Sequence, residues 1–400
     1  MTVDKRGLAK RIGTPAMSIF EKMNRLAEAH GAINLGQGFP DFAAPAFLRD
    51  TLMEIVAAGN EQYAHPAGEP GLTEAIARSF GGKTGLLVDP QREVTVTCGC
   101  QEAIAATLLA VIDPGDEVVV FEPFFETYRL CIAMAGGVPR FVTLRPPEFA
   151  LDEAALRAAF GPRTRAILVN TPHNPTGRVF SRSELGVIAQ LCLERDAIAL
   201  SDEVYEELVF EGIHLHIAAF DGMRERTVTV SSLGKTFSVT GWKIGWAIAP
   251  PRLTDGIRRA HQALAFSIAK PLQLSAIKAF SAPPAYFEEL RAGYRRRRDL
   301  LGDGLQAVGF TIHRPAGTYF MLADASLLGL GDDDQVCDYL TRRVGVTAIP
   351  SSYLYENREE GRKLVRFAFC KSDALISEVV RKLSALASIA TARLAVPSIS

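Results

Sequence analysis

Six short apolar runs, separated by segments with helical spacing, constrain the fold of this 400-residue chain more than any other feature. The runs are consistent with strands buried on both faces, which is typical of a mostly parallel sheet covered by helices on each side. Helices are predicted at 72–80, 102–111 and 181–195. The predicted strands are residues 94–97, 118–121, 166–170, 197–200, 228–231 and 245–249.

The chain is too long for one compact core, so two domains are expected. After about residue 285 the pattern changes to a long charged helix at 286–308, which contains four consecutive arginines at 295–298. Three separate strands, at 320–323, 346–349 and 364–369, follow it and alternate with helices. This part is expected to form a smaller α+β unit, and the arginine run is expected to be a solvated helix face.

Composition excludes several classes of function. The formal net charge is −1, and a protein held on nucleic acid by phosphate contacts would need a basic excess. No apolar stretch is long enough to span a membrane, and the basic N-terminus lacks the apolar run of a signal peptide, so a cytoplasmic location is expected. The six cysteines form no C-x-x-C pair. His214 and His216 lack an evident carboxylate or cysteine partner, so an ordinary loop and no metal site are predicted there.

Polar side chains gather where the predicted strands end, and ligands of such sheets bind at these ends. Asn174 follows the strand at 166–170, Asp202 and Tyr205 follow the strand at 197–200, and Ser232 and Lys235 follow the strand at 228–231. A turn at the start of a helix, at residues 99–101, follows the strand at 94–97. An amide, an acid, a phenol, a hydroxyl and an amine are therefore expected to meet in one crevice.

This set suits an aromatic phosphate cofactor that carries an aldehyde. The helix start after Gly99 offers free N–H groups to a phosphate, to which Ser232 and Lys243 would add a hydroxyl and a cation. Asp202 would keep a ring nitrogen protonated, while Asn174 and Tyr205 would bond a ring hydroxyl. Lys235 would form a Schiff base, for which it needs a lowered pKa.

Several motifs occur in the order seen in one enzyme family. The chain resembles the class I aminotransferases, pyridoxal 5′-phosphate enzymes of fold type I, over nearly its whole length. The resemblance is greatest to the branch that holds kynurenine, glutamine and methionine aminotransferases. The motifs are INLGQGFPDF at 33–42, EQY at 61–63, EPFFETY at 122–128, TPHNPTG at 171–177, SDEVYE at 201–206, SSLGKTFSVTGWKIGW at 231–246 and LVRFAFCK at 364–371.

The resemblance implies a role for each matched residue that touches the cofactor. Lys235 is the Schiff-base lysine and proton shuttle, and Asp202 is the partner of the pyridine nitrogen. Tyr205 and Asn174 bind the ring oxygen. The remaining cofactor contacts implied are the stacking ring of Phe125 and a phosphate cup of Gly99, Cys100, Gln101, Ser232 and Lys243.

Three more residues are implied to act on the substrate or across a subunit interface. Arg366 clamps the substrate α-carboxylate, with Gly38 and Asn174 beside it. Tyr63 reaches the phosphate of the neighbouring subunit, so a homodimer with shared active sites is implied. The chain departs from many relatives at Cys100 and Gln101, where a small or hydroxyl residue is usual, and at Lys243, where many have arginine.

The resemblance also implies a domain plan and a reaction. Residues 46–285 would form the large cofactor-binding domain, and the segment 1–45 would join the small domain 286–400. The implied reaction moves an α-amino group from an L-amino acid to a 2-oxo acid by ping-pong kinetics. A methionine, glutamine, aromatic or kynurenine-like donor is expected, because no arginine is evident for a distal carboxylate. An N-succinyl-diaminopimelate aminotransferase and a cysteine-S-conjugate β-lyase stay open as alternatives.

Overall fold

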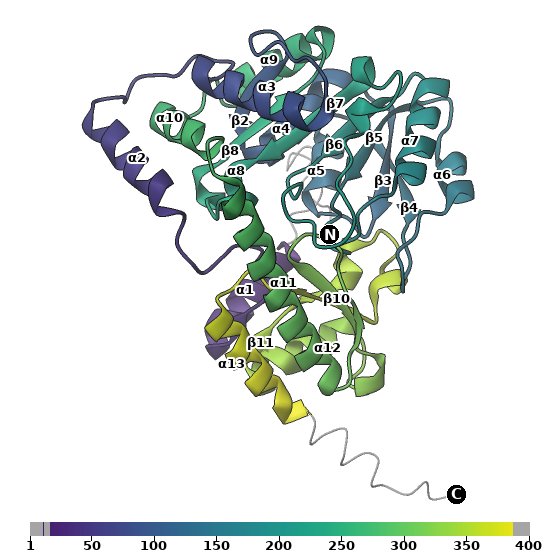
Figure 1. Cartoon of the computed structure of the whole chain (residues 1–400). Helices are drawn as coiled ribbons and strands as arrows, with labels where there is room; N and C mark the ends of the chain where they lie inside the picture. Colours follow the sequence, from purple (N-terminus) through teal and green to yellow (C-terminus); the bar gives the residue numbers. More distant parts are fainter. Residues whose placement is uncertain (1–10, 12–16, 387–400) are drawn as a thin grey trace, which may run out of the picture.

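The computed structural model describes Arg11 and residues 17–386, which form an upper and a lower lobe in Figure 1. Two predicted segments, the N-terminal segment 1–45 and the small domain 286–400, lie partly outside the described residues. The strands of the upper lobe are β2 (Val94–Cys98), β3 (Glu117–Glu122), β4 (Val138–Thr143), β5 (Thr164–Asn170), β6 (Ile198–Asp202), β7 (Thr227–Ser232) and β8 (Ile244–Ile248).

Within the described chain these strands make one sheet of seven, in the order β2-β8-β7-β6-β5-β3-β4. The strands from β7 to β4 run parallel, but β8 runs antiparallel to both of its neighbours. The short link between Ser232 and Ile244 holds only one helical turn and a 3₁₀ turn, whereas a parallel return needs a longer crossover. The predicted strand at 245–249 is therefore the one that breaks the parallel pattern.

Both faces of the sheet are buried, as predicted. On β5, Ala166 and Leu168 face one apolar core, while Ile167 and Val169 face another. Each such leucine, isoleucine or valine side chain contributes roughly 1.5–3 kcal/mol when fully buried. The helices of this lobe are α2 (Ala46–Ala57), α3 (Pro70–Thr84), α4 (Gly99–Val111), α5 (Thr127–Met134), α6 (Glu153–Ala159), α7 (Arg182–Glu194), α8 (Leu233–Thr236), α9 (Pro251–Leu264) and α10 (Lys270–Ala279).

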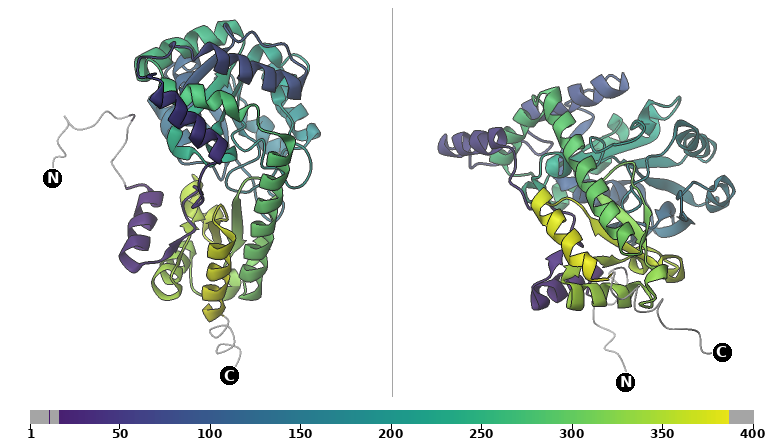
Figure 2. Two further views of the ribbon diagram at one scale, coloured as in Figure 1. Left: turned by 60° about the vertical axis from the view of Figure 1, so that its left-hand side comes forward. Right: turned by 60° about the horizontal axis from the view of Figure 1, so that its bottom comes forward.

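The lower lobe joins the two ends of the described chain. Helix α1 packs into the same apolar core as the C-terminal elements through Ile19 and Met23, and β1 pairs in parallel with β11. Figure 2 shows α1 beside the C-terminal helices. The elements of this lobe are α1 (Ile19–His30), β1 (Ile33–Asn34), β9 (Thr311–His313), β10 (Phe320–Asp324), α12 (Asp333–Tyr339), β11 (Val346–Thr347), β12 (Ile349–Pro350), β13 (Leu364–Ala368) and α13 (Asp373–Leu383).

The long helix α11 (Pro284–Ala307) descends from the upper lobe into the lower one (Figure 1). Its arginine run is only partly the solvated face that was predicted. Arg298 is buried and donates hydrogen bonds to Glu211, at 2.8 Å, and to the carbonyl of Pro315, at 2.9 Å. A guanidinium with several donors can be buried when nearby oxygens accept its N–H groups. The predicted domain limits at 45 and 285 stay predictions.

Several strands differ from the sequence prediction, which did not include β1, β4 or β9. The predicted strand at 346–349 is divided between β11, which pairs with β1, and β12, which joins a four-stranded antiparallel sheet in the order β12-β13-β10-β9 within the described residues. Strand β4 was missed because it lies at the sheet edge, where its first four residues alternate between exposed and partly buried and include Pro139.

Candidate active site

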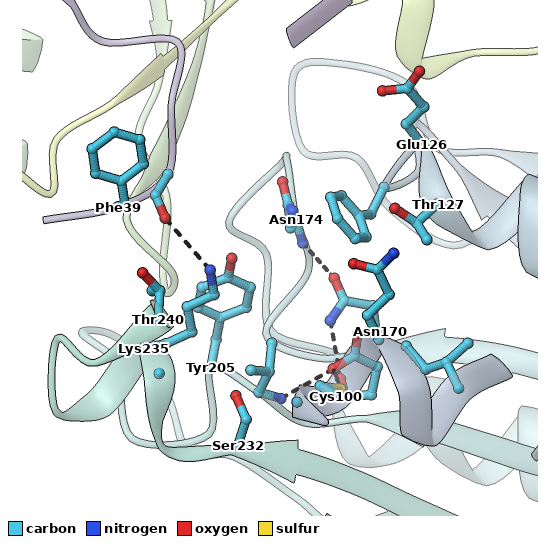
Figure 3. Close-up of a pocket in the computed structure, with 18 of the residues that line it drawn as sticks. Phe39, Cys100, Glu126, Thr127, Asn170, Asn174, Tyr205, Ser232, Lys235 and Thr240 are labelled. Carbon is cyan, nitrogen blue, oxygen red and sulfur yellow. Dashed lines mark hydrogen bonds between the residues drawn. The ribbon is translucent and has the colours of Figure 1, made fainter. Parts of the chain in front are cut away.

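A cavity of about 480 Å³ opens at the C-terminal ends of the parallel strands. Figure 3 shows the side chains that converge on it from β5, β7, α4, α8 and the N-terminal loop. Every site residue predicted from the sequence lines it except Tyr63. Those residues are Gly38, Gly99, Cys100, Gln101, Phe125, Asn174, Asp202, Tyr205, Ser232, Lys235, Lys243 and Arg366.

Strand register explains why these residues meet. Asn170 and Asp202 are paired at the ends of β5 and β6, and β7 ends next to them at Ser232. The single helical turn α8 then places Lys235 over the same edge. Asn174 is held by its own backbone N–H, which donates to the Asn170 side chain at 2.7 Å. The parallel sheet thus gathers residues that are far apart in sequence.

The carboxylate of Asp202 is buried and receives three hydrogen bonds. Tyr128 Oη donates to Oδ2 at 2.5 Å, while Cys100 Sγ and the backbone N–H of Val204 donate to Oδ1 at 3.3 and 3.2 Å. Burial raises the pKa of Asp202, and these three donors oppose that rise because they favour the anion. The site therefore supplies a fixed acceptor for a cationic or N–H group.

The amine of Lys235 has few polar partners among the described residues. Nζ lies 3.4 Å from the carbonyl oxygen of Gly38 and 5.7 Å from the centre of the Tyr319 ring. Burial lowers the pKa of Lys235, and the charge of Lys243 lowers it further, against the opposing pull of Asp202. The free-amine form is therefore more populated than in an exposed lysine, which suits a nucleophile.

One corner of the cavity is built to receive an anion. Helix α4 begins at Gly99, whose φ of 72° suits glycine, and its first residues line the cavity together with Lys243. A Cβ at Gly99 would lie 3.2 Å from Lys243 Nζ. A Cβ at Gly245 would lie 2.4 Å from the carbonyl carbon of Gly99, so β8 can approach this turn so closely only because Gly245 lacks a side chain. Ser232 adds a hydroxyl nearby.

Arg366, on β13, provides a buried cation at the opposite wall. Its Nη2 donates to the carbonyl of Gly36 at 2.8 Å and its Nη1 donates to Oδ1 of Asn174 at 3.2 Å. The ring of Phe320 lies 4.2 Å from its guanidinium carbon, and Nε has no hydrogen-bond partner among the described residues. Burial lowers the pKa of Arg366 to about 10, so the group stays cationic at neutral pH and is available to a carboxylate.

The two phenylalanines of EPFFETY have different surroundings. Phe124 is buried and stacks on Phe141 with ring centres 5.2 Å apart, whereas Phe125 lines the cavity. Tyr63 is 81% exposed and packs edge-on against Phe266, so it does not reach this cavity within one chain.

Sequence reasoning missed three groups that the structure places in the site. Tyr128 and Asn170 both line the cavity. Tyr128 ends the motif EPFFETY at 122–128, and Asn170 ends the predicted strand at 166–170. Glu126 also lines it and accepts a hydrogen bond from Ser18 at 2.7 Å. The signal for Tyr128 was the motif EPFFETY itself, because a phenol at a strand-to-helix turn faces the same edge as Asp202.

Comparison with known proteins agrees with this geometry. Residues 30–383 match the family model described as aminotransferase class I and II. The chain belongs to this family. It is 43% identical over 388 residues to a probable N-succinyldiaminopimelate aminotransferase, DapC, of Mycobacterium tuberculosis, covering 94% of this chain and 98% of that protein. It is 38% identical over 370 residues to the methionine aminotransferase of Escherichia coli, covering 92% and 96%.

A solved structure gives the same result for the fold. The N-succinyldiaminopimelate aminotransferase from Mycobacterium tuberculosis aligns with a TM-score of 0.92 at 43% identity, over 95% of this chain and all of that one. The predicted family, fold type and enzyme class are therefore confirmed. The protein is an aminotransferase that uses pyridoxal 5′-phosphate.

The residues present fit that cofactor. The corner formed by the α4 N-terminus, Lys243 and Ser232 matches a phosphate in charge and donor type. Asp202 offers an anionic acceptor for a pyridinium N–H, and Lys235 offers an amine for an aldehyde. Separately, no helix in the described part of the chain has both the length and the apolar composition that a membrane crossing requires.

Proposed function

We propose that this aminotransferase moves the α-amino group of an L-amino acid with a neutral or aromatic side chain to a 2-oxo acid, by ping-pong kinetics. The observation that carries the proposal is the meeting of the Lys235 amine, the buried Asp202 carboxylate and the Arg366 guanidinium in one cavity. When bound, pyridoxal 5′-phosphate supplies an aldehyde and an electron-accepting ring, which together weaken the substrate Cα–H bond.

The residues of the chain would bind and orient the two reactants. Arg366 would hold the substrate α-carboxylate through its planar donors, with Asn174 and the Gly38 backbone beside it. The α4 N-terminus and Lys243 would hold the phosphate. Asp202, fixed by Tyr128 and other donors, would keep a proton on the ring nitrogen. Nζ of Lys235 would take the proton from Cα and return it to the cofactor carbon.

The wall of the cavity supports a neutral donor side chain. Its described cations are Lys235, Lys243 and Arg366. In this proposal they serve proton transfer, the cofactor phosphate and the α-carboxylate respectively. Aromatic rings and neutral polar groups make up most of the remaining wall, and Glu126 adds a negative charge. A distal carboxylate on the donor would meet no free cation there and would be repelled by Glu126. Among the neutral lining residues are Ser18, Phe20, Gln37, Phe39, Thr127 and Phe320.

A second candidate is N-succinyl-diaminopimelate as the amino donor, because a relative of that name is 43% identical to this chain. Such a substrate carries extra carboxylates, for which the described wall of a single chain offers no spare cation. We therefore rank it below a neutral donor. A homodimer is also part of the proposal, as is a cytoplasmic location, which the free state of all six cysteines supports.

The deciding experiment is a panel of amino donors and 2-oxo acid acceptors assayed with the holoenzyme. Methionine, glutamine, phenylalanine and kynurenine are expected to exceed N-succinyl-diaminopimelate in kcat/KM by at least about tenfold. The reverse order would overturn the proposed donor class. Release of pyruvate and ammonia from a cysteine conjugate without an acceptor would instead identify a β-lyase.

The role of Lys235 is tested separately. Borohydride treatment of the holoenzyme followed by peptide mass spectrometry is expected to find a pyridoxyl group on Lys235 alone. Lys235→Ala is expected to keep the fold, by circular dichroism, and to lose transamination by roughly a thousandfold or more, since it removes both the nucleophile and the proton carrier. A variant that retained transamination above a tenth of the wild-type rate would remove the assignment.

A further inference from the structure

A second cluster of reactive side chains lies behind the active site, on the far side of the turn that follows β6. It consists of Glu203, His214 and His216. Glu203 Oε2 is 3.2 Å from His214 Nε2 and 2.5 Å from His216 Nδ1, and the two imidazole centres are 4.6 Å apart. The sequence had suggested no carboxylate partner for the histidine pair. That prediction was wrong, because Glu203, the residue that follows β6, lies within hydrogen-bond distance of both imidazoles.

Neighbouring groups hold the three residues in place. Ser201 donates to Oε1 of Glu203 at 2.7 Å, which leaves Oε2 directed at the histidines. The ring of Phe80 packs edge-on against His216 with centres 5.3 Å apart. The side chains of all three cluster residues are more than nine-tenths buried. Ordered supporting groups of this kind are a usual feature of metal-binding sites.

We propose that Glu203, His214 and His216 bind a divalent transition-metal ion of the Zn²⁺ class. Two imidazoles and one carboxylate are a common ligand set for Zn²⁺. Bonds of the usual length to a tetrahedral ion place ligand atoms about 3.3 Å apart. The Glu203–His214 distance of 3.2 Å already meets this, and His216 needs to retreat from Glu203 by less than about 1 Å.

Two further observations favour a ligand. His214 Nδ1, the ring nitrogen that does not face Glu203, is buried without a hydrogen-bond partner among the described residues, so it can carry the ring proton and leave Nε2 as the metal-binding nitrogen. Glu203, but neither histidine, also lines a separate cavity of about 200 Å³, which has room for a water beside this carboxylate. The same cavity is lined by Glu206, Glu207 and Lys83, so carboxylates outnumber ammonium groups around it.

The effect of the ion would be structural. It would link the loop that ends at His216 to the turn between Asp202 and Tyr205. Because residues of this turn line the cofactor cavity, the link would stabilise the wall of the cofactor site. Transamination is not expected to require the ion, because the cluster does not line the cofactor cavity in the described chain.

The test is isothermal titration of the metal-stripped holoenzyme with Zn²⁺, compared with His214→Ala. Wild type is expected to bind one equivalent per chain with a Kd of roughly micromolar or tighter, and the variant to bind at least about tenfold more weakly. His30→Ala, at an exposed histidine of α1, is the matched control and is expected to bind as wild type does. Co²⁺ is expected to give the visible absorption of a tetrahedral site only where His214 is present.

A second variant distinguishes loss of the Zn²⁺ site from unfolding of the protein. Glu203→Gln keeps a hydrogen-bonding side chain at the same place but removes the charge, so it is expected to keep the bound cofactor and its absorbance while losing the Zn²⁺ site. Absence of one-to-one binding by wild type would overturn the proposal, as would unchanged affinity in both cluster variants. Unchanged affinity would place the bound Zn²⁺ elsewhere, for instance at the cofactor phosphate.

Discussion

At the scale of single residues, the site depends on the surroundings of Lys235 as much as on its amine. Burial and Lys243 shift its pKa below the ordinary value of 10.5. The rate at which pyridoxal 5′-phosphate attaches to the apoenzyme depends on the neutral amine, so it is expected to rise with pH and to level off below pH 10.5. Absorbance measurements of the attachment rate from pH 6 to 10 check this.

A free lysine derivative is the control for that experiment, and its reaction is expected to level off only near pH 10.4. The enzyme is expected to level off at the lower pH because only the deprotonated amine reacts. A lowered pKa means that the proton leaves at a lower pH, so the reactive form is already abundant at neutral pH. An inflection for the enzyme at or above that of the free amine would show that the pocket does not favour the neutral form.

Glu126 gives the second prediction at this scale. Its carboxylate lines the substrate cavity and accepts a hydrogen bond from Ser18. Glu126→Gln is expected to change kcat/KM for methionine by less than about threefold and to raise kcat/KM for glutamate severalfold, since it removes a like charge. Steady-state kinetics with both donors measure the change in preference.

Ser18→Ala is the matched control, because it breaks the same hydrogen bond while keeping the charge. It is expected to leave the preference between methionine and glutamate as in wild type. If both variants shifted that preference equally, the hydrogen bond rather than the charge would set it.

At the scale of elements, sequence patterns predict what is local and miss what is distant. The buried parallel strands were predictable because their apolar runs are continuous, and so were residues that directly follow those strands, such as Lys235 and Asp202. The reversed direction of β8 was not predicted, because it depends on the short link before it. The contact between Asp202 and Tyr128 was not predicted either, since these residues lie 74 positions apart.

The close approach of β8 to the start of α4 gives an element-scale prediction. Gly245→Ala would place a methyl group 2.4 Å from the carbonyl carbon of Gly99 and 2.5 Å from the N–H nitrogen of Cys100. The turn that faces the phosphate must then move. The variant is expected to bind pyridoxal 5′-phosphate at least about tenfold more weakly, since misplaced donors lose most of their hydrogen-bond energy.

Gly241→Ala is the matched control in the same segment, because a Cβ there meets nothing within 4 Å. Cofactor affinity, measured by fluorescence titration of the apoenzyme, is expected to match wild type in this variant. A normal affinity in Gly245→Ala would mean that the turn does not position the phosphate.

At the scale of the whole molecule, one part of the upper lobe is left with exposed apolar side chains. Helix α2 lies at the outer edge of the lobe in Figure 1, and its Met53 and Val56 are 71% and 52% exposed. Tyr63 follows it and is 81% exposed. Large exposed apolar side chains that lie together favour a protein interface. They favour the proposed homodimer, in which Tyr63 of one subunit would reach the phosphate of the other.

Mixed dimers test this arrangement. Tyr63→Ala alone is expected to weaken cofactor binding by roughly tenfold, the loss typical of one hydrogen bond to a charged group, and Lys235→Ala alone is expected to be inactive. The mixed dimer has one Tyr63→Ala chain and one Lys235→Ala chain. If the tyrosine acts across the interface, one of its two sites contains both an intact Lys235 and an intact Tyr63; otherwise neither site does. Co-expression with two affinity tags isolates that dimer.

The mixed dimer is then expected to bind one cofactor with wild-type affinity and to show about half of the wild-type activity per dimer, because one of its two sites is complete. If Tyr63 acted within its own chain, the only site with a lysine would lack its tyrosine. The mixed dimer would then bind the cofactor as weakly as the Tyr63→Ala protein does. Measured affinity therefore distinguishes the two arrangements without reference to any particular substrate.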